Sequence, residues 1–201
     1  MQDFFARTVS ILLHPLIMPA VGLLLLLNSG TYLEFLTFQQ KRAIFIILFL
    51  GTAILPLTLM PVIMLQRRIA PEMSHHRDRV MPLFITVIFY AFTWHMLTRL
   101  NAPSLVNMYT ITAASTVLAC ALVSFRWKIS LHMAAQGALA GVFLATTFRF
   151  SLNMQLFLAL IFLAGGITGW ARLTLKAHTP AQVYAGYLGG FAIAFLIMFS
   201  F

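Results

Sequence analysis

The chain has 201 residues, of which 61% are hydrophobic and only 8% are charged, and its mean hydropathy is +0.94. This composition excludes a water-soluble globular domain, which needs much more charged surface. The formal net charge of +9 would suggest nucleic acid as the partner of a soluble protein. Here the 13 Lys and Arg residues stand almost wholly at the ends of hydrophobic runs, which favours anionic lipid headgroups or phosphate-bearing substrates and no nucleic acid.

Seven runs without charged residues follow one another along the chain, each 19 to 26 residues long. They cover residues 8–33, 43–66, 80–98, 100–125, 129–148, 150–171 and 177–201. A helix needs about 20 apolar residues to cross the hydrocarbon layer, where every backbone amide must be satisfied internally. The runs predict an all-α, polytopic transmembrane helical bundle of about seven spans, whose first run is a retained helix rather than a signal peptide. No linker divides the chain, so residues 1–201 are expected to form a single integral membrane domain.

The polar connections between these runs alternate between the two membrane faces, because successive spans run in opposite directions. The connections at residues 66–79, 126–130 and 172–182 therefore share one face with the N-terminus, and the other connections lie opposite. The span count thus predicts one surface where basic and histidine side chains converge. These are Arg67, Arg68, Arg77, Arg79, Arg126, Lys128, Arg172, Lys176, His75, His76, His132 and His178.

Three segments on this shared face carry the residue types that phosphate chemistry needs. They are residues 75–82, 128–132 and 172–182. Arginine and lysine bind phosphate oxygens by charge-assisted hydrogen bonds, and Ser130, at the expected start of a helix, adds a neutral donor. Histidine supplies a nucleophile or a proton donor near neutral pH. The structural alternative for His132 and His178 is an interfacial polar residue that a neighbour satisfies.

Glycine pairs at four-residue spacing mark the last three runs. The pairs are Gly137 with Gly141, Gly165 with Gly169, and Gly186 with Gly190. Such pairs place both glycines on one helix face and let neighbouring backbones approach closely. Although glycine is common in membrane helices, the pairs predict close packing that holds the second and third segments rigidly together.

Several other chemistries lack the residues they require. The chain has four acidic residues, no His-Glu-x-x-His motif and no nucleotide-type glycine loop, so no metal, cofactor or ATP site is expected. Arg67, Arg68 and Arg126 are interpreted as topology anchors at helix ends. His14 and His95 fall within the first and third runs, away from the three segments, and are expected to be structural or are left without an assigned role.

The three segments resemble the signatures of the membrane-embedded type 2 phosphatidic acid phosphatases, which read Lys-x6-Arg-Pro, Pro-Ser-Gly-His and Ser-Arg-x5-His-x3-Asp. In the third, Arg172, His178 and Gln182 keep the spacing, and a Val-x-Ala-Gly sequence follows. In the second, Ser130 and His132 keep the serine and the histidine.

The remaining positions depart from these signatures. Ile129 replaces the proline and Leu131 the glycine of the second segment. In the first segment Arg79 stands three residues before Pro82, and Glu72 occupies the place of the lysine. The resemblance covers about residues 66–190.

The resemblance implies a six-helix core and a metal-independent phosphatase without a cofactor. In such an enzyme His178 attacks phosphorus to give a phosphohistidine, His132 protonates the departing lipid alcohol, and Gln182 takes the place of the aspartate that orients the nucleophile. The implied phosphate-binding residues are Arg79 or Arg77, Lys128, Ser130 and Arg172. The implied partner is a phosphorylated lipid of the phosphatidic acid, phosphatidylglycerophosphate or polyprenyl diphosphate class, among membrane lipids, with no oligomeric state implied.

Two departures from the family leave alternatives open. Gln182 accepts a hydrogen bond as aspartate does but brings no charge, and Leu131 replaces a glycine. A non-catalytic lipid-phosphate binding or transport protein and a lipid phosphotransferase therefore stay beside the phosphatase. A purely structural membrane subunit would explain the composition but not the spacing of histidine and arginine.

The orientation of the shared face can be interpreted in two ways. It carries nine of the Lys and Arg residues against four opposite, which by the positive-inside rule places the face in the cytoplasm. Residues that bind phosphate, however, are not topology signals. The resemblance to bacterial lipid phosphatases implies the bacterial inner membrane, with the site on the extracytoplasmic side.

Overall fold

The computed structural model describes residues 2–67 and 76–200, without the side chains of residues 63, 64, 66, 67 and 76. The described chain is all helical, as predicted. The elements in order are α1 (Gln2–Leu12), α2 (Met18–Leu26), η1 (Tyr32–Phe35), α3 (Phe38–Phe49), the π-helical turn η2 (Leu50–Ile54), α4 (Leu55–Arg67), η3 (His76–Arg79), α5 (Val80–Arg99), α6 (Ser104–Ser124), α7 (Leu131–Phe150), α8 (Gln155–Thr174) and α9 (Pro180–Ser200).

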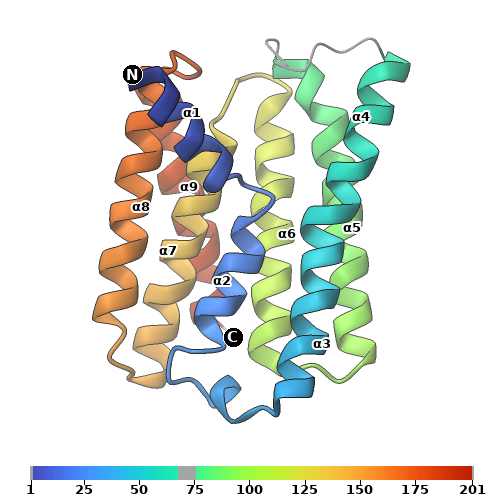
Figure 1. Ribbon diagram of the computed structural model, residues 1–201, viewed down its shortest axis with the longest axis vertical. Helices are drawn as coiled ribbons and strands as arrows, with labels where there is room; N and C mark the ends of the chain where they lie inside the picture. Colours follow the sequence, from blue (N-terminus) through green and yellow to red (C-terminus); the bar gives the residue numbers. More distant parts are fainter. Residues whose placement is uncertain (1, 68–75, 201) are drawn as a thin grey trace.

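Six helices in the described residues are long and apolar enough to cross a membrane, so this is an integral membrane protein. The α3, η2 and α4 segments form one of them and extend as a continuous rod in Figure 1. Its π turn ends two residues before Pro56, which has no N–H to donate to the carbonyl of Thr52 within that turn. The other five are α5 to α9.

The prediction that residues 8–33 form one spanning helix is wrong. The chain forms two short helices there, α1 and α2, separated by residues 13–17. Pro15 has no N–H to donate to the carbonyl of Ile11, and Pro19 lies in the first turn of α2, where proline is tolerated. The pair still leads the chain from one end of the bundle to the other (Figure 1), so the predicted alternation of the connections survives the break.

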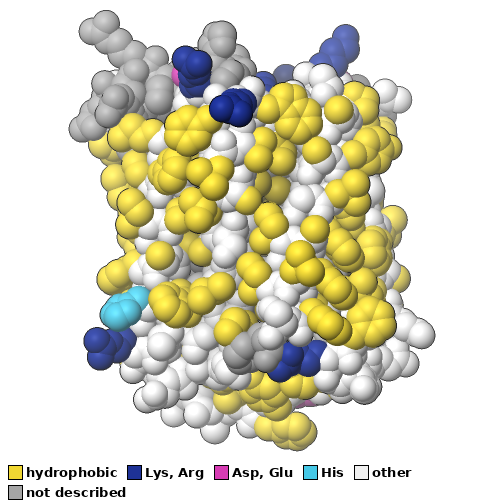
Figure 2. Space-filling view, turned by 180° about the vertical axis from the view of Figure 1, so that it is seen from behind, with side chains coloured by type: hydrophobic (Ala, Val, Ile, Leu, Met, Phe, Trp, Pro, Cys, Tyr) yellow, Lys and Arg dark blue, Asp and Glu magenta, His cyan; other side chains and the backbone are white. Residues whose placement is uncertain are grey.

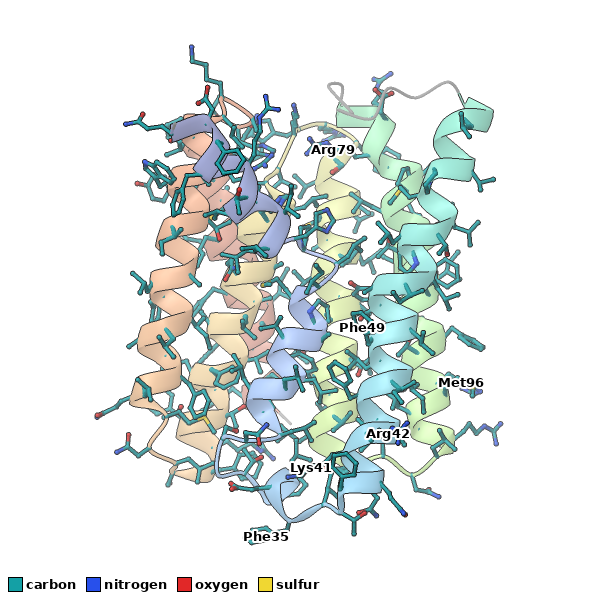
Figure 3. All side chains as sticks on the ribbon, in the orientation of Figure 1. Phe35, Lys41, Arg42, Phe49, Arg79 and Met96 are labelled. Carbon is teal, nitrogen blue, oxygen red and sulfur yellow. The ribbon has the colours of Figure 1, made fainter. Side chains whose placement is uncertain are left out.

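The predicted shared face is confirmed for the described residues. Figure 1 shows the N-terminus, the end of α4, η3, the α6–α7 connection and the α8–α9 connection at one end of the bundle, and the C-terminus at the other. We call this end the site face. Figure 3 places Arg79 there and Phe35, Lys41 and Arg42 toward the opposite end. Arg68 and His75, which were expected at the site face, lie outside the described residues.

Hydrophobic side chains cover the middle of the bundle surface, with Lys and Arg near both ends (Figure 2). Large apolar residues on this surface include Leu156 and Leu160 of α8 and Leu196 of α9, which are 71%, 54% and 66% exposed. A water-soluble protein rarely exposes so continuous an apolar surface. The surface is therefore suited to lipid contact.

Helices α7 and α9 pack backbone to backbone through two of the predicted glycine pairs. A Cβ atom at Gly137 or Gly141 of α7 would collide with the carbonyl oxygen of Tyr187 or Phe191 of α9. A Cβ atom at Gly190 of α9 would collide with the carbonyl oxygen of Ala134. Only glycine permits this approach, so the prediction of close packing is confirmed for these helices.

The glycine pair of α8 behaves differently. Cβ atoms at Gly165 and Gly169 would meet side-chain atoms, 3.0 Å from the Tyr187 ring and 3.5 Å from the methyl group of Met133. Side chains can yield where backbone cannot, so α8 is fixed less tightly than α7 and α9. The strongest constraint therefore falls on the two helices whose N-termini carry His132 and His178.

Candidate functional site

A cavity of about 370 Å³ opens near the site face and extends into the bundle. Near the site face it is lined by His14, Arg79, His132, Arg172 and His178. Its deeper lining is mostly apolar and comes from α2, α4, α5, α6 and α7. These deeper residues include Leu57, Leu83, Val117, Ala138, Leu139 and Val142, together with Thr86, Tyr90, Thr112 and Thr116.

The cavity reaches about half-way through the bundle. Arg79 and Tyr90 both line it and are eleven residues apart on η3 and α5, which corresponds to about 16 Å at the rise of an α-helix. The hydrocarbon layer is about 30 Å thick. The cavity thus joins a cationic end to an apolar interior, which is the polarity pattern of a lipid with a charged headgroup.

The imidazole of His178 is held by the first turn of α9. Its Nδ1–H donates to Oε1 of Gln182 at 3.0 Å. The same amide oxygen accepts the backbone N–H of Thr179 at 3.2 Å, and Oγ1 of Thr179 accepts the backbone N–H of Gln182 at 3.4 Å. These reciprocal bonds form a capping box. Because Nδ1 carries the proton, Nε2 keeps the lone pair of the neutral ring.

His178 is buried among positive charges. Its pKa is lowered to about 4, chiefly by burial; the Gln182 hydrogen bond raises it, and the charges of Arg79, Arg172 and Lys128 lower it. Burial and the charges of Arg79 and Arg172 also lower the pKa of Lys128. Arg79, Arg172 and Lys128 therefore lie near enough to His178 for their charges to act on it. In the absence of an anion, His178 is neutral at pH 7.

The second histidine, His132, lies at the start of α7 and is oriented by α1. Its Nε2–H donates to the carbonyl oxygen of Ser10 at 3.1 Å. Nη1 of Arg172 donates to the Ser10 hydroxyl at 3.3 Å. Ser10 is buried, with 8% of its surface exposed. The end of α1 therefore positions two of the residues that line the cavity.

The other predicted phosphate-binding residues support the site in different ways. Nη1 of Arg79 donates to the carbonyl oxygen of Ile129 at 3.4 Å and so connects η3 to the α6–α7 connection. Ser130 is fully buried, and its backbone N–H donates to the carbonyl oxygen of Gln182 at 3.4 Å. Its hydroxyl, like Nε of Arg172, has no hydrogen-bond partner within the described part of the chain. Buried polar groups of this kind call for a ligand or water.

The structure distinguishes two arginines that the sequence treated as equivalent. Arg79 lines the cavity, whereas Arg77 is exposed and does not. Gln182, Lys128 and Ser130 stand around the lining residues without lining the cavity themselves. His95 is exposed on α5, as its structural assignment allows.

His14 does not lie away from the three segments, as the sequence predicted. This residue lines the cavity, and its ring lies edge-on to that of His132 with 5.5 Å between the ring centroids. The signal that could have found it is the His14-Pro15 pair within an apolar run, because a proline there predicts a break in the helix. Among the residues that the structure describes, no group of three or more His, Cys, Asp or Glu side chains could hold a metal ion.

Comparison of the chain with models of protein families, with curated proteins and with solved structures gives no significant match. Any function assigned to the cavity therefore depends on the chemistry of its own residues.

Proposed function

We propose that this protein is a metal-independent lipid phosphatase of the type 2 phosphatidic acid phosphatase kind, acting through a phosphohistidine. The observation that carries the proposal is the hydrogen bond between Nδ1 of His178 and Gln182, which leaves Nε2 as a nucleophile in a cavity that Arg79 and Arg172 also line. A neutral imidazole beside two guanidinium groups is suited to attack on a phosphoryl group that those cations bind.

The proposed reaction has two steps. Nε2 of His178 forms a bond to phosphorus while the bond from phosphorus to the lipid oxygen breaks. His132, protonated once the anionic headgroup lies beside it, gives its Nδ1 proton to that oxygen. Water then attacks the phosphohistidine, returns a proton to His132 and releases inorganic phosphate from His178. Arg79 and Arg172 stabilise the charge on the phosphoryl oxygens in both steps. The Ser10 carbonyl, which accepts Nε2–H of His132, supports the protonated ring.

The apolar part of the cavity supports a lipid as the substrate. Leu83, Val117 and Leu139 line it below the cationic residues. A hydrocarbon chain enters this part of the cavity from the bilayer and not from water. The affinity for the lipid therefore depends on how well the chain packs against the cavity wall. Phosphatidic acid, phosphatidylglycerophosphate and polyprenyl diphosphates all have the required polarity.

A second function, lipid-phosphate binding without hydrolysis, is favoured by Gln182. Its amide oxygen is shared between His178 and the cap of α9, and it brings no charge to stabilise an imidazolium. A binding or transport protein needs the cations but not an activated nucleophile. A lipid phosphotransferase differs from the phosphatase only in the acceptor of the second step.

Phosphate release from the three lipid classes in detergent, with a chelator present, tests the phosphatase. We expect release by the wild type, loss of at least about 10³-fold in His178→Ala, and no loss in His95→Ala, a matched histidine outside the cavity. Equal release by the wild type and His178→Ala would exclude this mechanism. Binding without release in the wild type would favour the second function.

We further propose the bacterial inner membrane as the location, with the site face on the extracytoplasmic side. The support is the resemblance of the three segments to bacterial lipid phosphatases. The positive-inside rule does not count against it where cations such as Arg79 and Arg172 serve the cavity and are not topology signals. The C-terminus lies at the other end of the bundle (Figure 1). A C-terminal reporter that is active only in the cytoplasm should therefore be active.

A further inference from the structure

The break between α1 and α2 brings a third histidine to the cavity, beside the two of the predicted segments. His14 follows the end of α1 and stands four residues after Ser10, about one helical turn away. Ser10 accepts hydrogen bonds from both His132 and Arg172. Residues 10–14 therefore form a fourth segment of the site, which lies outside the region that resembles the phosphatase family.

The hydrogen bonding of His14 fixes the position of its proton. The backbone N–H of Leu16 donates to Nδ1 of His14 at 3.3 Å, so Nδ1 must be the unprotonated nitrogen. Nε2 then carries the hydrogen of the neutral ring. Protonation of Nδ1 would break the bond to Leu16. His14 is thus a neutral donor, unsuited to give up a proton but suited to hold an oxygen atom.

The surroundings of His14 define the oxygen that it can hold. His132 and Arg172, which line the same cavity, are both anchored to Ser10, and the ring of His14 stands edge-on to that of His132 at an angle of 82° between planes. No acidic side chain lines the cavity in the described chain, so the acceptor must come with the ligand. An anionic oxygen is the acceptor that neighbouring guanidinium groups would attract.

We infer that His14 is a headgroup-binding residue, which donates Nε2–H to a phosphoryl oxygen of the lipid while Arg79 and Arg172 supply the charge. This inference rests on the proposed function only in needing a phosphorylated lipid in the cavity, and it holds whether or not that lipid is hydrolysed. A neutral histidine selects a ligand by the position of its acceptor oxygen, because the single N–H must point at that oxygen. The guanidinium groups, by contrast, attract any anion.

The test is the affinity for a lipid phosphonate, which cannot be hydrolysed, in nanodiscs, compared with the same lipid ending in a hydroxyl group. His14→Phe keeps the ring contact with His132 but removes the donor, and we expect about tenfold weaker binding of the phosphonate with no change for the alcohol. His14→Gln, which keeps an N–H donor, should recover most of the affinity. His95→Phe is the matched control.

Each outcome bears on the inference separately from the phosphatase. Wild-type affinity in His14→Phe, or equal weakening for phosphonate and alcohol, would overturn the role of His14 and leave the phosphatase standing. Failure of the wild type to bind the phosphonate would overturn both. If His14→Phe fails to fold, the folded His14→Gln variant provides the test. Because His14→Gln keeps an N–H donor, a loss of phosphonate affinity of about tenfold in this variant would contradict the inference.

Discussion

Oε1 of Gln182 lies 3.0 Å from Nδ1 of His178 and 3.2 Å from the backbone nitrogen of Thr179, so one amide oxygen both caps α9 and orients the imidazole. An aspartate at this position would make the same contacts and add a negative charge. The neutral amide therefore determines how strongly an imidazolium or a phosphohistidine on His178 is stabilised, and it is the position where catalysis is most open to change.

Replacement of Gln182 by Asp should increase phosphate release by roughly tenfold or more. In serine proteases the corresponding aspartate contributes about 10⁴ in rate, and its amide variant fails because it holds the wrong tautomer. A smaller gain is expected here because Gln182 already holds the Nδ1–H tautomer of His178. The carboxylate should also raise the pKa of His178 and shift the pH profile upward. Gln182→Asn, which has the length of Asp without its charge, is the control. Equal rates in both variants would show that charge at this position is irrelevant.

The stability of the ligand-free protein should decrease as the pH falls from 6.5 to about 4. The pKa of His178 is lowered from 6.5 to about 4 by folding, so between these values the unfolded chain binds a proton that the folded chain does not. This destabilisation by His178 is absent above pH 6.5 and complete below about pH 4. His178→Gln should reduce this slope in unfolding experiments, and a saturating lipid phosphonate should reduce it in the wild type. Parallel curves for wild type and variant would contradict the prediction.

Substitution of Gly190 by Val should destabilise the bundle by about 1–3 kcal/mol or prevent its assembly. A Cβ atom at Gly190 meets the backbone of Ala134, which cannot move without separating α7 from α9. The adjacent Gly189 has open space around it, so Gly189→Val is the control. Unfolding midpoints in detergent measure the difference. Similar midpoints for the two variants would show that this helix contact yields more easily than its geometry indicates.

A Phe at position 138 should obstruct the apolar part of the cavity. Ala138 lines it six residues after His132 on α7, about 9 Å deeper at the rise of a helix. Loss of about ten atom contacts between the substrate chain and the cavity wall, at about 0.1–0.2 kcal/mol each, should raise KM for long-chain lipids by roughly tenfold and affect a short-chain analogue little. Ala159→Phe, on the exposed surface of α8, is the control. An equal effect on both chain lengths would place the tail elsewhere.

Much of the architecture follows from the sequence, because a segment that crosses the hydrocarbon layer must satisfy its own backbone hydrogen bonds. An uncharged run of sufficient length must form a helix, and alternating directions then decide which connections share a face. The number of spans, without any knowledge of packing, predicts that Arg79, His132 and His178 lie at one face, and all three line the cavity. The backbone contacts of Gly137 and Gly190 were also open to prediction, since paired glycines on one helix face have a specific steric consequence.

The tertiary structure alone decided which side chains reach the cavity. The sequence treated Arg77 and Arg79 alike, but Arg77 is exposed and only Arg79 lines the cavity. Residues 8–33 were long and apolar enough for one helix, yet Pro15 breaks them and turns His14 toward His132. Hydrophobic length determines that a segment enters the membrane. The direction of each side chain depends on helix rotation and on contacts between distant segments, which only the folded arrangement of α1, α7 and α8 supplies.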